Sequence, residues 1–317
     1  MYEPTPRVRD LNTVGQADPI VGATAKLGRS GVVSAEARIV GPNACGQSMR
    51  PARGQKAPRG AVTSPFAPKM KNSTLRNLRE STVSVVIPAR NEERNLPHVL
   101  PNIPEWVHEI ILVDGHSTDA TIEVAERLLP TIRVIQQLGD GKGAALRTGF
   151  AATTGDIVVM LDADGSMDPA EIPAYVGQLL AGSDFVKGTR FAQGGGTSDM
   201  TNLRRVGNWG LTQLVRGCFG GRFTDLCYGY VAFWRDVLPV LSLCTDGFEI
   251  ETEMNLRALR AGLRIAEVPS FEAERIYGAS NLRTFVDGWK VLKTIARETV
   301  AKPALPFVIS AAERDDT

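Results

Sequence analysis

Asp162 and Asp164, two aspartates separated by one residue, have the most specific chemistry of any side-chain pair in this chain. Their carboxylates can together hold a hard divalent cation, which can in turn neutralise a diphosphate. The spacing alone is weak support, because 17 aspartates in 317 residues give about one such pair by chance and often serve only in turns. The position is stronger support, since the pair follows the apolar run 157–161, where unbalanced charges would be costly. We favour a metal site over a simple turn.

Lys142 stands between two glycines, Gly141 and Gly143, at the start of a predicted helix. Backbone N–H groups at a helix N-terminus and a nearby lysine suit an anion such as a diphosphate. Taken alone, Lys142 is as easily a solvated capping residue as a ligand. Because the aspartate pair is also present, we favour a diphosphate ligand.

Short β-branched runs precede these polar groups and predict strands that are covered on both faces. The runs are residues 83–88, 109–114, 156–162 and 184–189. Helical segments alternate with them, at residues 95–100, 118–129, 141–153 and 169–180. This alternation predicts an α/β fold with a mainly parallel central sheet and helices on both faces. Ligands bind beyond the carboxyl ends of such strands, so the polar residues that follow the runs should line one edge.

The chain after residue 190 is less regular. Residues 191–200 are expected to form a loop, followed by helices at 202–215 and 247–261. Asp246 and Glu249 have the spacing of a capping box for the second of these helices.

The last amphipathic stretch, residues 285–295, places Phe285, Trp289 and Leu292 on one face. Such a face can dock on a core or lie on lipid. We favour docking on a core.

The composition, with 43% hydrophobic and 22% charged residues, is that of a globular chain and excludes collagen, coiled coils and wholesale disorder. The formal charge of +1 gives no sign of a nucleic-acid binder.

Residues 1–80 carry 13 basic and 5 acidic side chains, whereas the remainder carries 23 basic and 30 acidic ones. We expect a disordered basic tail at 1–79, a folded domain at 80–300 and a C-terminal tail at 301–317. The first tail is either an over-long start or a segment drawn to anionic lipid.

The sequence lacks the pattern of a signal peptide and has no apolar run of membrane-spanning length. We therefore expect a cytoplasmic protein, with peripheral contact at the cytoplasmic membrane face left open.

Eight motifs in a fixed order, which cover about residues 82–297, together resemble a known family. They are V-I-P-A-R-N-E-E at 86–93, V-D-G-H-S-T-D at 113–119, G-K-G-A-A at 141–145, D-A-D-G at 162–165, T-D-L-C-Y-G-Y at 224–230, G-F-E-I-E-T-E at 247–253, E-V-P at 267–269 and R-I-Y-G-A-S-N-L at 275–282. The series is similar to family 2 GT-A glycosyltransferases, and the last four motifs resemble the dolichol-phosphate mannose synthase-like branch.

The resemblance implies a Rossmann-like GT-A fold and an inverting glycosyltransferase that uses Mg²⁺ or Mn²⁺ and a nucleotide-sugar donor such as a GDP- or UDP-hexose. It makes residues 80–300 the catalytic domain. The residues expected to bind the donor are Pro88, Ala89, Glu92, Asp114, Lys142 and Asp162. Asp162 and Asp164 match the pair that binds the metal and the diphosphate.

Three arginines, Arg190, Arg204 and Arg275, match positions that in this branch face donor and acceptor phosphates. Each has a simpler interpretation. Arg190 could be a strand-end surface charge, Arg204 a helix-face charge, and Arg275 the partner of a nearby glutamate in a rim ion pair.

Three positions depart from the common family pattern: Arg90 replaces an aromatic residue, Gly115 replaces an aspartate, and Ser166 replaces a glutamine that can complete the metal shell. These departures leave the donor base open. Water can fill the place of the missing glutamine, since Mg²⁺ readily keeps water ligands.

The acceptor decides whether the reaction needs a general base. A polyprenyl phosphate is already anionic at neutral pH, whereas a hydroxyl acceptor needs a base within about 3 Å of the attacking oxygen. Candidate bases are Asp225, our first choice, Glu249 and Glu251. Transfer to a soluble hydroxyl, on a phosphorylated metabolite or a glycan, is the alternative activity. A nucleotide-sugar-binding protein without turnover and a nucleotidyltransferase are the other classes considered.

Overall fold

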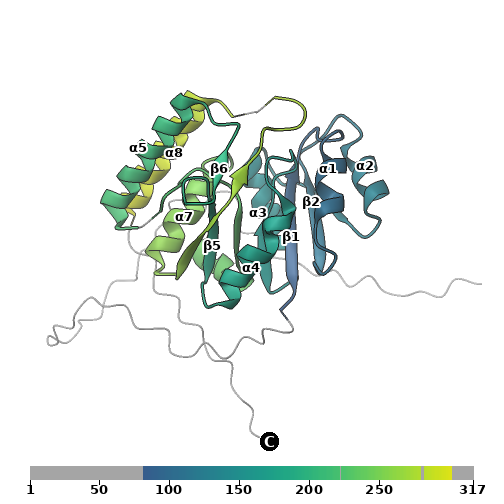
Figure 1. The fold of residues 1–317 in the computed structure, drawn as a ribbon, viewed down its shortest axis with the longest axis horizontal. Coiled ribbons are helices and arrows are strands. Elements are labelled where there is room, and N and C mark those ends of the chain that lie inside the picture. Colours follow the sequence, from purple (N-terminus) through teal and green to yellow (C-terminus); the bar gives the residue numbers. More distant parts are fainter. Residues whose placement is uncertain (1–80, 222, 280–281, 302–317) are drawn as a thin grey trace, which may run out of the picture. The chain divides into compact units, whose positions relative to one another are not determined.

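The computed structural model describes residues 81–221, 223–279 and 282–301 (Figure 1). These ranges belong to the predicted catalytic domain, apart from residue 301. The predicted tail at 1–79 and the rest of the tail at 301–317 lie outside the described residues, as do Ser280 and Asn281 of the last motif.

A seven-stranded sheet forms the centre of this domain, with the strand order β3-β2-β1-β4-β7-β5-β8. Its strands are β1 (Val83–Ala89), β2 (Glu109–Asp114), β3 (Arg133–Gln136), β4 (Ile157–Met160), β5 (Phe185–Thr189), β7 (Val231–Trp234) and β8 (Ile265–Pro269). β1 pairs in parallel with β2 and β4, as do β2 with β3 and β5 with β8. Only β7 in this sheet of the described domain runs antiparallel, between β4 and β5. The predicted mainly parallel sheet is confirmed, although the sequence analysis missed β3, β7 and β8.

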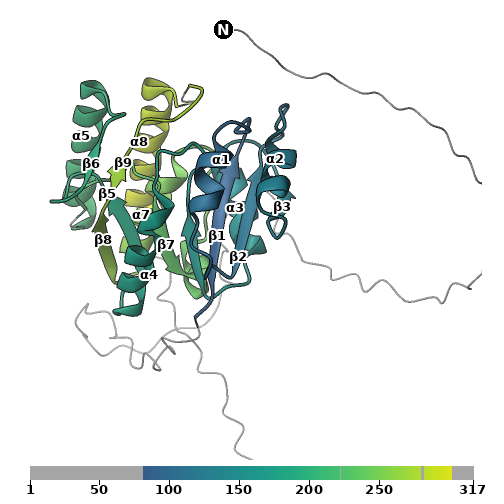
Figure 2. The same ribbon diagram turned by 45° about the vertical axis from the view of Figure 1, so that its right-hand side comes forward.

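Helices cover both faces of the sheet (Figures 1 and 2). They are α1 (Leu96–Val99), α2 (Thr121–Leu128), α3 (Lys142–Ala152), α4 (Ile172–Leu180), α5 (Asn202–Phe219), α6 (Leu238–Leu241), α7 (Ile250–Arg260) and α8 (Thr284–Val300). The 3-10 turns η1 (Leu100–Asn102), η2 (Pro169–Glu171) and η3 (Arg235–Val237) extend three of them. A two-stranded sheet of β6 (Gly196–Thr197) and β9 (Phe271–Glu272) joins the predicted loop to the segment after β8.

The central strands are apolar throughout because both of their faces are covered. Val85, Val86 and Ile87 of β1 are fully buried, as is every residue of β4. Packing of α3 against β1 and β2, and of α4 against β5, β7 and β8, buries these faces. This burial on both sides explains why the runs are continuous and do not alternate with polar residues.

The start of α7 differs from the sequence-based expectation. The helix begins at Ile250, and its N-cap, Glu249, makes no side-chain cap hydrogen bond. Asp246 instead pairs with Arg147 of α3, with 2.7 Å between Oδ1 and Nη2. The predicted capping box was therefore wrong, because Asp246 is held by a neighbouring helix rather than by its own.

The exposed face of α8 also differs from the expectation. Val291 and Ile295 pack into a second hydrophobic cluster with residues of α5 and α7, including Val215. Phe285 and Trp289, by contrast, are 80% and 57% exposed. The expectation that these two aromatic side chains dock on a core was wrong, since the helix is rotated so that the valine and isoleucine face inward.

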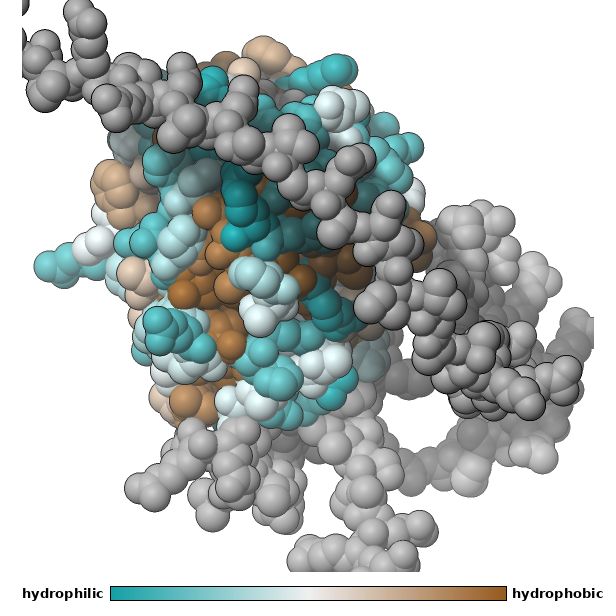
Figure 3. All heavy atoms as spheres, turned by 90° about the vertical axis from the view of Figure 1, so that its right-hand side faces the viewer, coloured by the Kyte–Doolittle hydropathy of each residue, from teal (hydrophilic) through white to brown (hydrophobic). Residues whose placement is uncertain are grey.

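The surface of the domain is apolar in places. The side of the sheet that carries α1 and α2 shows a group of apolar residues surrounded by polar ones (Figure 3). Among the described helices, none combines the length and the hydrophobicity that a membrane span requires.

Gly149→Ala should destabilise the domain, because a Cβ at this position of α3 would lie 2.4 Å from Cγ1 of Val86 and 2.8 Å from Cγ2 of Val113. Overpacking of this kind costs about 1–3 kcal/mol of unfolding free energy, measurable by urea denaturation. Gly217→Ala in α5 is the matched control, since its Cβ would meet no atom within 4 Å. The control should gain about 0.5–1 kcal/mol of helix propensity. Equal stability of the two variants would contradict the close packing of α3 on the sheet.

Candidate active site

A cavity of about 1110 Å³ lies at the carboxyl edge of the sheet. Its walls come from the ends of β1 and β4, from the N-terminal turns of α3, α5 and α8, and from residues 272–279. The predicted site residues that line it are Pro88, Ala89, Glu92, Lys142, Asp162, Asp164, Arg190, Arg204, Arg275 and Glu251. The structure therefore brings together most of the residues singled out in the sequence.

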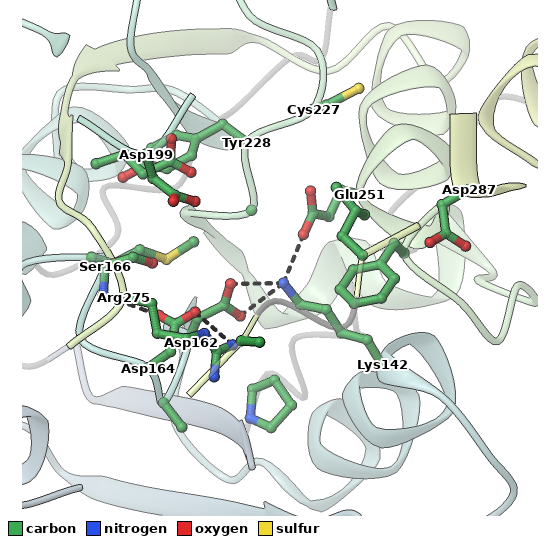
Figure 4. Close-up of a pocket in the computed structure, with 18 of the residues that line it drawn as sticks. Lys142, Asp162, Asp164, Ser166, Asp199, Cys227, Tyr228, Glu251, Arg275 and Asp287 are labelled. Atoms are coloured by element: carbon green, nitrogen blue, oxygen red, sulfur yellow. Dashed lines mark hydrogen bonds and ion pairs between the residues drawn. The ribbon is translucent and has the colours of Figure 1, made fainter. Parts of the chain in front are cut away.

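Each aspartate of the pair faces its own cation (Figure 4). The Nζ atom of Lys142 lies 2.8 Å from the Asp162 carboxylate and 2.8 Å from Oε1 of Glu251. The Nη2 atom of Arg275 lies 3.0 Å from Oδ2 of Asp164. The backbone N–H of Ser166 donates to the other oxygen of Asp164 at 3.0 Å.

Burial and neighbouring charges set the electrostatics of this group. Burial raises the pKa of Asp162 to about 6; Lys142 opposes the rise, while Asp164 and Glu251 add to it. Burial alone would lower the pKa of Lys142, but Asp162 and Glu251 outweigh it and raise the pKa. Burial also opposes the charge of Arg275, yet Asp164 and Glu92 raise its pKa. Both cations stay protonated, and the carboxylates still carry excess negative charge that attracts a further cation.

The donor set of the aspartate pair fits a divalent metal. Its atoms are carboxylate oxygens, which Mg²⁺ and Mn²⁺ prefer. Within residues 81–221, 223–279 and 282–301, no group of three or more His, Cys, Asp or Glu side chains is arranged to hold a metal. Two protein ligands would leave positions for diphosphate oxygens and water, as Mg²⁺ requires.

The glycines around Lys142 serve a packing role that the sequence analysis did not identify. The carbonyl of Asp246 accepts hydrogen bonds from the backbone N–H groups of Gly143, at 2.7 Å, and Ala144, at 3.2 Å. A Cβ at Gly143 would lie 2.4 Å from the Thr245 carbonyl oxygen. These two N–H groups are thus occupied, and the side chain of Lys142, rather than the helix N-terminus, faces the cavity.

The residues predicted to bind the donor differ in whether they reach the cavity. Pro88 and Ala89 line the cavity, whereas Asp114 is buried behind it and accepts from the Ser117 N–H at 3.1 Å. Gly115, which follows Asp114, reaches the cavity wall in its place. Glu92 accepts a hydrogen bond of 2.9 Å from Arg275.

Asn95 fastens the segment that carries Arg275. It accepts from the Tyr277 N–H at 2.9 Å and donates to the Tyr277 carbonyl at 3.2 Å. The Arg94 guanidinium lies 4.0 Å from the centroid of the Tyr277 ring. Sequence reasoning missed Asn95, because its only signal was its place next to the first motif, 182 residues from its partner.

Arg190 is buried and tightly bound at the end of β5. Its guanidinium pairs with Asp225 at 2.6 Å and with Glu272 at 3.0 Å, and it lies 4.8 Å from the Tyr228 ring centroid. Asn208 of α5 donates to Oδ1 of Asp225 at 2.9 Å. Arg190 can present only a part of its charge to the cavity, because two carboxylates already hold it.

Asp225 occupies a different place from the one expected for a base. It is fully buried and does not line the cavity. Both of its carboxylate oxygens accept hydrogen bonds from Arg190, and Oδ1 also accepts one from Asn208. Burial alone would raise the pKa of Asp225, but the hydrogen bonds and charge of Arg190 outweigh it and lower the pKa. A role for Asp225 near metal or acceptor therefore stays a prediction, and the structure shows Arg190 and Asn208 as its partners. Of the three candidate bases, only Glu251 lines the cavity, where Lys142 neutralises it.

Arg204 has the loosest partner of the three predicted arginines. It lies on the first turn of α5, 3.8 Å from Asp199, and its side chain is a quarter exposed. Since it lines the cavity and Asp199 holds it only at 3.8 Å, part of its charge is available to a ligand.

Known proteins are similar to this chain in sequence and in fold. Residues 84–241 match the family model described as glycosyl transferase family 2. Glycosyltransferase AglJ of Haloferax volcanii is 34% identical over 209 residues, which make up 65% of this chain and 68% of that protein. Undecaprenyl-phosphate mannosyltransferase of Micrococcus luteus is 31% identical over 222 residues, 66% of this chain and 91% of that protein.

Solved structures give the same result at the level of the fold. Glucosyl-3-phosphoglycerate synthase of Mycobacterium tuberculosis with phosphoglyceric acid has a TM-score of 0.55 at 25% identity, and covers 75% of this chain and 87% of that one. The same enzyme has been solved with Mn²⁺, uridine diphosphate and phosphoglyceric acid, and with Mg²⁺ and uridine diphosphate. The chain belongs to glycosyltransferase family 2, with a GT-A fold, and is a hexosyltransferase.

Proposed function

We propose that the enzyme transfers a hexose, with inversion, from a nucleotide-diphosphate sugar to a polyprenyl phosphate. The observation that carries the proposal is the aspartate pair at the cavity wall, with Lys142 on Asp162 and Arg275 on Asp164. Such an edge suits a diphosphate and its metal. The complexes of the M. tuberculosis enzyme with Mn²⁺ and a uridine nucleotide support this use of the edge.

The chain's own residues would divide the work of binding between them. Pro88, Ala89 and Gly115 would contact the nucleoside, while Lys142 would hold the diphosphate by charge. When bound by Asp162 and Asp164, Mg²⁺ or Mn²⁺ would supply positive charge that stabilises the departing nucleotide diphosphate. The acceptor oxygen attacks the anomeric carbon on the side opposite the leaving group, which inverts that carbon.

The acceptor phosphate would bind near Arg204. This arginine has the most accessible charge of the three, and the apolar side chains of Leu203 and Phe285 line the same cavity. The cavity thus offers complementary groups to a phosphate and to an apolar chain. A phosphate acceptor also needs no general base, which agrees with the burial of Asp225. We place the reaction in the cytoplasm, at the membrane face.

Transfer to the hydroxyl of a soluble phosphorylated acceptor is the second candidate. The M. tuberculosis structures with phosphoglyceric acid favour it, since they share this fold and cover most of both chains. In that reaction Glu251 would be the base within the cavity, and Lys142 would have to release it. Family membership speaks against the two remaining alternatives, an inert nucleotide-sugar binder and a nucleotidyltransferase.

Asp164→Asn should lower transfer by at least about a hundredfold, because one of two metal-binding carboxylates is lost. Transfer is measured with UDP- and GDP-hexoses, with and without Mn²⁺, to polyprenyl phosphate and to phosphoglycerate in parallel. Glu126→Gln, the same chemical change at an exposed position of α2, should keep full activity. An Asp164→Asn enzyme that is active and indifferent to metal would refute the proposed metal site.

Metal-assisted binding of UDP-glucose should weaken as pH falls through about 6, because the raised pKa of Asp162 lets a proton compete with the metal. Calorimetry should therefore find weaker binding at pH 5 than at pH 7, since less of Asp162 is ionised at the lower pH. UDP-glucose is a suitable probe because its two phosphates carry no monoester proton. Binding that stays constant over this range would contradict the shifted pKa.

Asp225→Asn should destabilise the fold by about 3–5 kcal/mol, because Arg190 would remain buried with its main charge partner removed. Asp199→Asn, which alters a half-exposed pair at 3.8 Å, should cost at most about 1 kcal/mol in the same urea titration. If Asp225→Asn instead keeps its stability and loses only transfer, Asp225 acts as a base and not as a positioning residue.

A further inference from the structure

Six large apolar side chains stand exposed on the N-terminal halves of two neighbouring helices. We call them the α5–α8 surface: Leu203, Val206, Trp209, Phe285, Val286 and Trp289. Val206 is 67% exposed and Trp209 64%, and large apolar side chains that gather on one exposed surface mark an interaction site. The two helices pack against each other and lie side by side (Figures 1 and 2).

The surface is continuous with the active-site cavity. Leu203 and Phe285 belong both to the α5–α8 surface and to the cavity wall, and the first turns of both helices line the cavity. A ligand with an apolar chain could therefore enter the cavity along this surface.

The charge of the two helices is one-sided. α5 contains no acidic residue, and the two acidic residues of α8, Asp287 and Glu298, are buried. The exposed charged side chains of the two helices are all basic: Arg205, Arg216, Lys290 and Lys293. Whatever covers the α5–α8 surface must therefore tolerate or prefer positive charge.

A second copy of this chain is a poor occupant, because two such surfaces face to face would bring like charges together. An anionic bilayer surface fits better. Tryptophan and phenylalanine partition to the boundary between headgroups and acyl chains, and flanking lysines and arginines bind anionic headgroups.

We infer that the α5–α8 surface docks the enzyme on an anionic membrane, with the cavity mouth held at the headgroup level. The inference rests on the proposed lipid-phosphate acceptor, and it adds which surface of the enzyme contacts the membrane. Docking by partial insertion needs no membrane-spanning helix, and apolar area and basic charge contribute together. Both of these features are present on the same two helices.

The test is cosedimentation of the full chain with vesicles of phosphatidylcholine, alone or with about one third phosphatidylglycerol. The wild type should bind the anionic vesicles, and less so at high salt. Trp209→Ser with Trp289→Ser should bind at least about tenfold more weakly, since both rings lose their insertion. Lys293→Gln should bind about fivefold more weakly, whereas Lys290 is left unchanged because it pairs with Asp287 at 3.4 Å. Neither tryptophan lines the cavity.

Trp106→Ser is the matched control, because Trp106 is 52% exposed but lies before β2, at the amino edge of the sheet. It should bind as the wild type does. Equal binding of the Trp209 and Trp289 variant, or no binding of the wild type, would overturn the inference. A dimer that the tryptophan variant dissociates, or an acidic protein that competes with the vesicles for the wild type, would overturn it as well.

Mn²⁺-assisted binding of UDP-glucose, measured on the same preparations, separates the two proposals. A wild type that binds the nucleotide but not the anionic vesicles would reject the docking surface and leave the glycosyltransferase site standing. Loss of nucleotide binding in the wild type would reject the proposed site, whatever the vesicles show.

Discussion

The balance of charge around Asp162 and Asp164 is the constraint on which the active site depends. Two carboxylates at the end of a buried strand need cations, and the fold supplies Lys142 from α3 and Arg275 from the segment after β9. Each cation also holds a second carboxylate, Glu251 or Glu92, so four acidic groups share two positive ones. A divalent ion entering with a diphosphate, which carries two negative charges, adds no net charge. The excess negative charge of the four carboxylates attracts the divalent ion, whereas a diphosphate without the ion would add to that excess.

The cations are positioned by contacts that no local pattern reveals. Gly143 lets the backbone at residues 245–246 approach α3 closely, and this approach fixes the helix from which Lys142 reaches Asp162. Asn95 fixes the backbone at Tyr277, two residues beyond Arg275. The aspartate pair thus depends on segments from both ends of the domain.

Strands that are set by a local run of apolar residues were predictable from the sequence. The β-branched runs gave β1, β2, β4 and β5, because burial on both faces requires continuous apolar residues. β7 was missed because a four-residue antiparallel strand carries little periodic signal. In the site, residue type indicated the chemistry of Asp162 and Lys142, but not their partners. Asp225 shows where prediction from sequence stops. The surrounding sequence suggested a base, and only the buried contact with Arg190 indicates a positioning role.

The helix α5 links the surface of the domain to the interior of the site. Its inward face carries Asn208, which holds Asp225 and, through it, the guanidinium of Arg190. Its outward face carries Val206 and Trp209, and Arg204 beside them reaches the cavity. A rotation of this helix would move all three sets of contacts at once, and it is resisted by the hydrogen bond of Asn208 and by the packing of Val215 in the second hydrophobic cluster. If the outward face meets lipid, the phosphate of a lipid acceptor lies at the depth of Arg204, because the headgroup layer and the cavity mouth are then at the same level.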